Sequence, residues 1–221
     1  MTDTHITLAG KAPAEPLELE RANDRGFETV ELYLERSHLA NVARTLEVVD
    51  GAPVDVASVH TPHVPIDDLE WMRRADRVAD ALDAYLVVHS NRVVLAHVSK
   101  LEELAFESRY GYENNPGASV RHVESVILER GHEFVLDTAH LYMAEGDYVS
   151  ALDHLLTEYA DRIEVVHLCD STLQQDGLAF GEGSMDMARV IRLLKREFDG
   201  IVVLEVMPEY QRDANEYYES I

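Results

Sequence analysis

The chain has 221 residues, of which 46% are hydrophobic and 28% charged, and such values are typical of a folded globular protein and exclude a disordered or fibrous one. Its 42 acidic residues against 19 Lys and Arg give a formal charge of −23, and no basic run offers the phosphate contacts that a nucleic-acid partner needs. The length suits a single domain over residues 1–221.

Short β-rich runs of apolar residues, bounded by turn residues, recur along the chain. They predict strands at residues 5–9, 29–34, 54–60, 85–89, 109–113, 134–137, 163–168 and 201–206. Helical patterns alternate with these runs, several of them with apolar residues at amphipathic spacing. They predict helices at residues 15–26, 36–49, 67–83, 93–107, 119–131, 148–161, 184–198 and 209–220.

This alternation determines the expected fold class. Strands that are apolar on both faces are typical of a parallel sheet, and eight βα units of about 28 residues are enough for an α/β (β/α)8 TIM barrel. The alternative, an open doubly wound sheet, would typically carry a glycine-rich phosphate loop after its first strand. Here that turn reads AGKAPAEP, so we expect the barrel.

In such a barrel the active site lies at the carboxyl ends of the strands. The third to eighth predicted strands end in or near His60, His89, Glu113, Asp137, His167 and Glu205. One such residue alone is more often a turn or ion-pair residue, but six in register indicate a metal site. Imidazole and carboxylate ligands together suit Zn, Mn, Fe or Co. His63 follows His60 in VHTPH, and the sequence is compatible both with a position at the barrel mouth and with one outside the site.

Cysteine content and hydropathy indicate the setting of the protein. The only cysteine, Cys169, excludes an intrachain disulfide, and we expect it to be a small buried residue rather than a nucleophile. No run approaches the ~18–20 apolar residues of a membrane span, and the N-terminus lacks a signal-peptide pattern, so we expect a cytoplasmic protein without membrane contact. Many acids with few lysines also indicate a halophilic source.

An ordered set of motifs resembles a known family over nearly the whole chain. The motifs are VHTPH from Val59, VVHSN at the fourth strand, YENNPG around Glu113, LDTAH from Leu136, HLCDS from His167, GEGSMD from Gly181 and LEVMP around Glu205. The set resembles the xylose isomerase-like TIM barrel superfamily. That superfamily contains sugar and sugar phosphate isomerases and epimerases, inosose dehydratases and apurinic endonucleases of the endonuclease IV type.

The resemblance implies a divalent metal ion, Mn, Zn, Co or Fe, held by Glu113, Asp137, His167 and Glu205. It implies a sugar, sugar phosphate or polyol isomerase or epimerase, in which the metal polarises substrate oxygens while Glu113 and Glu205 move the α-proton through an enediolate. A homo-oligomer is compatible with it. The substrate contacts expected from these motifs and their neighbours are His140, His60, His89, Asn114, Tyr112, Asp170 and Phe180.

Two alternatives stay open. An endonuclease IV type phosphodiesterase would add a second metal at His60 and His89, joined by Glu113, but the Asp-x-His pair of its third metal is reduced here to Asp176 and Leu178. The other alternative is a non-catalytic barrel that binds a sugar or a metal.

Phosphate recognition in the loop after the seventh strand lacks support, because residues 168–188 contain no Lys or Arg. Lys11, Arg92 and Arg109 lie near strand ends and are alternative candidates for substrate contacts.

Overall fold

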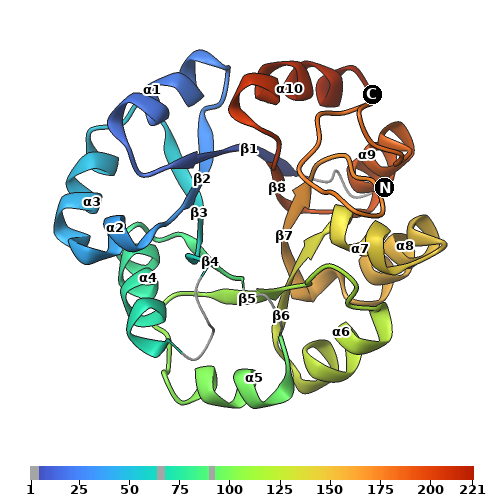
Figure 1. The fold of residues 1–221 in the computed structure, drawn as a ribbon, viewed down its shortest axis with the longest axis horizontal. Coiled ribbons are helices and arrows are strands. Elements are labelled where there is room, and N and C mark those ends of the chain that lie inside the picture. The colour runs from blue at the N-terminus through green and yellow to red at the C-terminus, as the bar shows by residue number, and fades with distance from the viewer. Residues whose placement is uncertain (1–4, 64–67, 90–92) are drawn as a thin grey trace.

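The structure, a computed structural model that describes residues 5–63, 68–89 and 93–221, has a closed barrel of parallel strands at its centre (Figure 1). Each strand pairs with the next in the sequence, and the last pairs with the first. The strands are β1 (Ile6–Pro13), β2 (Thr29–Tyr33), β3 (Asp55–His60), β4 (Tyr85–Val88), β5 (Tyr110–Glu113), β6 (Glu133–Asp137), β7 (Ile163–Leu168) and β8 (Gly200–Leu204). The expected (β/α)8 barrel is confirmed.

Helices form a ring around the barrel (Figure 1). They are α1 (Pro16–Asp24), α2 (Arg36–Ala40), α3 (Val42–Asp50), α4 (Leu69–Ala81), α5 (Leu95–Glu102), α6 (Val120–Val126), α7 (Thr138–Ala144), α8 (Tyr148–Glu158), α9 (Met187–Glu197) and α10 (Gln211–Ser220). Single 3-10 turns are η1 (Leu128–Arg130), η2 (Ala160–Arg162) and η3 (Pro208–Tyr210). Within the described residues, no helix has both the length and the apolar character that spanning a membrane requires.

The helices differ from the sequence-based expectation at their ends. The helix predicted over 36–49 is two helices, because Asn41 leaves the helical conformation and its side chain accepts a hydrogen bond from the Arg44 amide to start α3. The helix predicted over 119–131 stops earlier and finishes in η1, which Gly131 closes with a left-handed backbone. Helix α7 has no counterpart among the predicted helices.

Strand β1 is longer than predicted. The apolar run suggests an end at residue 9, whereas the strand continues to Pro13 and pairs Lys11 with Glu31 of β2. A lysine inside this strand is accommodated because its ammonium group faces carboxylates within the barrel. A polar residue near a strand end is therefore not by itself a signal that the strand has stopped.

Side chains alternate between two apolar cores along each strand. Those that point outward pack under the helices, as Leu86, Phe134 and Val166 do. Those that point inward form a smaller apolar layer, made of Ala9, Tyr85, Val87, Val135, Val165 and Val203. Two residues beyond Ala9, Val87, Val135, Val165 and Val203, the inward positions are charged or histidine, and these positions form part of the candidate site.

Candidate metal centre

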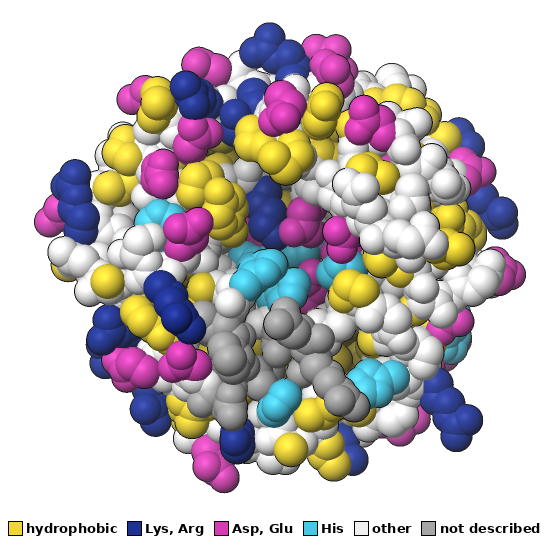
Figure 2. All heavy atoms as spheres, viewed as in Figure 1, with side chains coloured by type: hydrophobic (Ala, Val, Ile, Leu, Met, Phe, Trp, Pro, Cys, Tyr) yellow, Lys and Arg dark blue, Asp and Glu magenta, His cyan; other side chains and the backbone are white. Residues whose placement is uncertain are grey.

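Each of the eight strands delivers one histidine or charged side chain to the same end of the barrel. These residues are Lys11, Glu31, His60, His89, Glu113, Asp137, His167 and Glu205, in the order β1 to β8. Figure 2 shows histidine side chains gathered at the middle of this face, with acidic and basic side chains beside them. The structure thus brings together all six strand-end residues of the predicted metal site, and it adds Glu31 and the alternative candidate Lys11.

Four of these side chains converge on one point. Oxygen or nitrogen atoms of Glu113, Asp137, His167 and Glu205 all lie within 4.8 Å of one another. His167 Nδ1 lies 3.3 Å from Glu113 Oε1 and 3.1 Å from Glu205 Oε2, so one imidazole nitrogen faces both glutamates. Glu113 and Glu205 thereby stand on either side of the same small volume.

The charges of this group depend on one another. Burial raises the pKa of Glu113, but the neighbouring His89 and His167 outweigh it and hold that pKa well below its ordinary value. Burial also raises the pKa of Glu205, but the neighbouring Lys11 and His167 outweigh it and hold that pKa well below its ordinary value. Burial and the two neighbouring glutamates raise the pKa of Asp137 to about 6. The site is therefore strongly acidic and contains three carboxylates.

These residues fit a divalent metal ion. Glu113 Oε2 and Glu205 Oε2 are buried oxygens that accept no well-aligned hydrogen bond from any described residue, so both have lone pairs to offer. Three carboxylates and one imidazole form a mixed oxygen and nitrogen donor set that suits Zn, Mn, Fe or Co. A cation would also offset the repulsion among the carboxylates.

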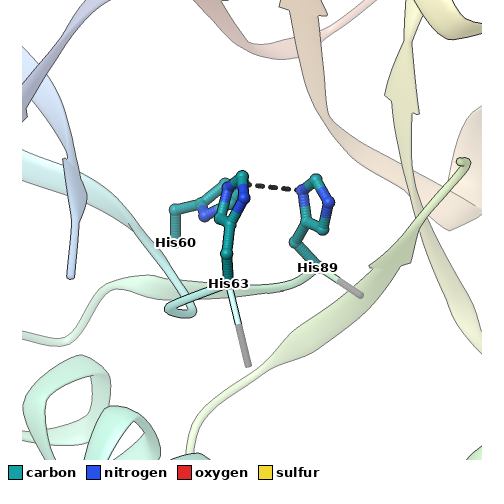
Figure 3. A group of neighbouring side chains, drawn as sticks. All are labelled: His60, His63 and His89. Atoms are coloured by element: carbon teal, nitrogen blue, oxygen red, sulfur yellow. Dashed lines mark hydrogen bonds between the residues drawn. The ribbon is translucent and has the colours of Figure 1, made fainter. Parts of the chain in front are cut away.

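Three histidines form a second group beside the first (Figure 3). His60 Nε2 lies 3.3 Å from His89 Nδ1, and Glu113 Oε2 lies 3.2 Å and 3.0 Å from these two nitrogens. His63 stacks on His89 with ring centroids 4.5 Å apart. His60 Nδ1 donates to the Thr61 carbonyl at 2.8 Å, which leaves its Nε2 as the nitrogen directed at the group.

Two histidines of this second group, His60 and His63, favour the neutral form. Burial lowers the pKa of His60, and burial together with His89 and His60 lowers the pKa of His63 to about 4. Neutral imidazole is the form that binds a metal. The group therefore has the donor spacing of a further metal site, with Glu113 shared between the two.

His140 is held at the edge of the site by three neighbours. Asp137 caps helix α7 by accepting from the His140 amide at 2.7 Å, and this contact places the imidazole beside the metal ligands. Nδ1 of His140 donates to the Asn114 carbonyl at 2.7 Å, and Nε2 lies 2.9 Å from Asp176. Burial lowers the pKa of His140, but Asp137 and Asp176 outweigh it and raise that pKa to about 10.

Asn114 acts on the backbone rather than on the cavity. Its side-chain amide donates to the Asp137 carbonyl at 2.9 Å and its side-chain oxygen accepts from the Asp137 amide at 2.8 Å. The side chain thereby ties the end of β5 to the end of β6. The expected substrate contact at Asn114 is corrected to a structural link between two ligand-bearing strands.

Two aromatic expectations are also corrected. Tyr112 precedes Glu113 on β5, so it points to the opposite face of the strand; it is fully buried and packs edge-on against His132 outside the barrel. Phe180 contacts Tyr217 of α10, with ring centroids 5.7 Å apart, and does not line the cavity at the metal centre. Neither side chain is placed to stack on a ligand there.

The carboxylate of Asp170 is occupied by hydrogen bonds within its own loop. Its carboxylate accepts hydrogen bonds from the amides of Ser171, Gly181, Gly183 and Met185, at 2.7 to 3.1 Å. A Cβ on Gly183 would lie 2.2 Å from Asp170 Oδ1, so the GEGSMD motif needs glycine there to close around the carboxylate. The expected substrate contact at Asp170 is therefore corrected to a clamp of the loop.

Lys11 and Glu31 complete the centre, and Glu31 is absent from the sequence-based prediction. Lys11 forms ion pairs with Glu205 and, at 3.1 Å, with Glu31, while Glu31 is fully buried. The available signal for Glu31 was an acid in the middle of the apolar run TVELYL. Arg109 pairs instead with Glu164 near the start of its strand, and Arg92 lies outside the described residues.

A cavity of about 150 Å³ opens onto the four-ligand group and is lined by His63, His89, Glu113, Asp137, His140, Cys169, Asp176, Gly177 and Glu205. Cys169 Sγ accepts from the Gly177 amide at 3.3 Å, and burial raises the pKa of the thiol well above its ordinary value. Cys169 is thus a buried, protonated wall residue.

Comparisons with known proteins agree with the barrel fold. Residues 19–221 match a family model described as xylose isomerase-like TIM barrel. No curated protein sequence matches the chain. Similar solved structures include D-allulose 3-epimerase from Methylomonas sp., at 15% identity over 98% of both chains with a TM-score of 0.73. A xylose isomerase domain protein from Alicyclobacillus acidocaldarius shares 17% identity over 97% of both chains with a TM-score of 0.69. A sugar phosphate isomerase/epimerase from Parabacteroides distasonis shares 15% identity over 98% of this chain and 95% of its own, with a TM-score of 0.66.

Proposed function

This chain belongs to the xylose isomerase-like TIM barrel family, and from that membership and the site geometry we propose that it is a divalent-metal-dependent isomerase or epimerase of a small sugar or polyol. The observation that carries the proposal is the pair of glutamates, Glu113 and Glu205, which flank one four-ligand group at a small cavity. The similar structures named as sugar epimerases support the same substrate class.

Glu113, Asp137, His167 and Glu205 would hold the metal, whose chemistry there is to polarise a carbonyl and an adjacent hydroxyl of the substrate. One glutamate carboxylate takes the proton from the carbon next to the carbonyl, and a water molecule beside the other glutamate returns a proton to the neighbouring position or the opposite face. The proton taken by the first glutamate then neutralises the hydroxide that this water leaves. Both glutamates have lowered pKa values, so both are ionised at neutral pH and ready to accept a proton. His140 is cationic and pairs with Asp137 and Asp176, so it supplies a positive charge at the edge of the site.

The test is proton exchange, because it reports the chemistry before the substrate is identified. Protein loaded with Mn²⁺, Co²⁺ or Zn²⁺ is incubated in D₂O with a panel of ketoses, aldoses and inososes. We expect deuterium to appear on the carbon next to the carbonyl of at least one compound, and chelation to stop it. No exchange on any member by protein that carries its metal would contradict the proposal.

A second candidate function rests on the three histidines. The spacings of 3.0 to 3.3 Å among His60 Nε2, His89 Nδ1 and Glu113 Oε2 suit a second metal, which would convert the centre into a two-metal phosphodiesterase site of the endonuclease type. The charge of −23 and the lack of a histidine at Leu178 disfavour it. Incision of an abasic-site duplex, with two metals per chain and loss on chelation, would favour this candidate.

A non-catalytic barrel is the third reading, and Glu205→Gln separates it from the other two. If the protein only binds its ligand, the wild type shows no turnover and the variant changes nothing. If the wild type exchanges a substrate proton and the variant does not, the binding-only reading is excluded. Metal content measured on both proteins controls for loss of the metal itself.

A further inference from the structure

Glu31 and Lys11 are buried charged groups that the proposed reaction does not use. They are register partners on β2 and β1, and Lys11 Nζ lies 3.1 Å from Glu31 Oε1. Glu31 is fully buried, and the Lys11 side chain is only 12% exposed. Burying an ionised pair is costly unless geometry and hydrogen bonds offset the lost hydration, so the arrangement needs an explanation.

His167 connects this pair to the metal ligands. Its Nε2 lies 3.1 Å from Glu31 Oε2, and its Nδ1 lies on the other side of the ring, facing Glu113 and Glu205. A carboxylate can only accept from a ring N–H, so contact with Glu31 keeps the proton on Nε2. The lone pair of Nδ1 is then the one available to a metal.

Lys11 extends the same arrangement to a second ligand. Its ammonium forms ion pairs with both Glu205 and Glu31. A single cation on β1 therefore contacts one proposed metal ligand, Glu205, and also the carboxylate that faces a second proposed ligand, His167. Glu205 Oε2 remains directed at His167 Nδ1. Lys11 therefore holds one oxygen of Glu205 while leaving the other toward the metal group.

Glu31 is poorly suited to be a metal ligand itself, although it lies close enough to His60 and His167 to be considered. Its Oε2 already accepts from Ser58 Oγ at 2.8 Å and faces His167 Nε2, while its Oε1 faces Lys11. Oε2 is thus occupied by hydrogen-bond donors, and Oε1 lies in an ion pair with Lys11 although it accepts no well-aligned hydrogen bond from a described residue.

We propose that Glu31 and Lys11 are positioning residues of the metal centre: Glu31 fixes His167 with Nδ1 toward the metal, and Lys11 supplies the countercharge and aligns Glu205. This rests on the proposed function only in requiring that a metal binds at Glu113, Asp137, His167 and Glu205. The role is to set ligand orientation and affinity, and neither residue needs to touch the substrate.

The first test compares metal affinity among matched variants. Zn²⁺ dissociation constants are measured by chelator competition for the wild type, Glu31→Ala, Glu31→Gln and the control Glu124→Gln. Glu124 accepts from His154 Nε2 at 2.8 Å on the surface, so the control removes a comparable carboxylate–histidine contact away from the site. We expect Glu31→Ala to weaken binding about 10- to 100-fold, Glu31→Gln to recover part of the loss because its amide oxygen still accepts, and the control to match the wild type.

The second test needs no variant and covers the case in which Glu31→Ala fails to fold. In zinc-loaded protein labelled with ¹⁵N-histidine, long-range ¹H–¹⁵N correlation reports which ring nitrogen of His167 carries the proton. A proton on Nε2 and metal on Nδ1 support the proposal, and the reverse assignment overturns it, as does unchanged zinc affinity in both Glu31 variants. If zinc affinity behaves as expected but no sugar exchanges a proton, the positioning role stands and the proposed function alone fails.

Discussion

Two layers inside the barrel have opposite chemistry although they lie only two residues apart on the same strands. Val135, Val165 and Val203 fill the inner layer without any charge, whereas Asp137, His167 and Glu205 above them form an ionised cluster. The apolar layer stabilises the fold, since each buried side chain of this size contributes about 1.5–3 kcal/mol. The charged layer holds the residues of the proposed metal centre and opposes folding unless its charges are paired. The comparison shows that strand alternation can separate stability from function at very short range.

The sharpest way to separate the layers is to neutralise the charged one without changing its shape. Glu113→Gln and Glu205→Gln should each lower kcat/KM for the substrate found by deuterium exchange about 10²- to 10⁴-fold, because each removes a proton-transferring carboxylate. Circular dichroism should show an unchanged fold. A variant that keeps wild-type turnover would remove that glutamate from the proposed proton path.

Removing the metal tests whether the charged layer depends on a cation. At a metal concentration about 100 times Kd, binding stabilises the fold by about 2.7 kcal/mol, which corresponds to a Tm shift of roughly 5–10 °C in a chain of this size. We therefore expect EDTA to lower Tm by that amount and added metal to restore it. Identical melting curves with and without EDTA would mean that the four-ligand group binds no metal.

Val165→Ala addresses the other layer. Deleting two methyl groups directly below His167 should cost about 1–3 kcal/mol of unfolding free energy, from lost burial and a small cavity, while kcat and metal affinity stay at wild-type values. Urea denaturation and zinc competition measure the two quantities on the same sample. If the free energy of zinc binding falls by as much as the free energy of unfolding, the two layers are energetically coupled and the contrast between them does not hold.

Salt should act on the surface more than on either inner layer. Raising KCl from about 0.1 M to about 1 M shortens the screening length from about 10 Å to about 3 Å, which weakens the repulsion among the surface charges of a chain whose formal net charge is −23. We expect Tm to rise by a few degrees, in line with our proposal of a high-salt source. A flat or falling Tm in calorimetric scans would contradict that proposal.

The last effect concerns pH at the edge of the charged layer. The pKa of His140 is raised from 6.5 to about 10 in the fold, so its stabilising contribution is complete below about pH 6.5 and is lost as the pH rises through about 10. In metal-free protein, wild-type Tm should therefore fall more between pH 7 and pH 10 than that of His140→Gln. Parallel Tm profiles for the two proteins would show that His140 carries no such charge.

The sequence predicts the barrel from the alternation of strand and helix patterns. It predicts six of the strand-end residues because a polar residue ends each of those apolar runs. The same period-2 rule places Tyr112 on the opposite face from Glu113, so that correction was within reach of the sequence. Lys11 and Glu31 were harder to place, because their charges are balanced by partners on other strands. The role of Asp170 could not be predicted from the sequence, because its carboxylate accepts hydrogen bonds from backbone amides of a distant part of the loop.

The clamp around Asp170 has a consequence for the kinetics and thermodynamics of ligand capture. Because the chain supplies its own anion to the amides of Gly181, Gly183 and Met185, the loop over β7 is ordered before any ligand arrives. Ligand binding then carries no entropic cost of ordering that loop, and the ligand enters a preformed cavity. These amides should exchange with solvent deuterium as slowly in the free protein as in the complex.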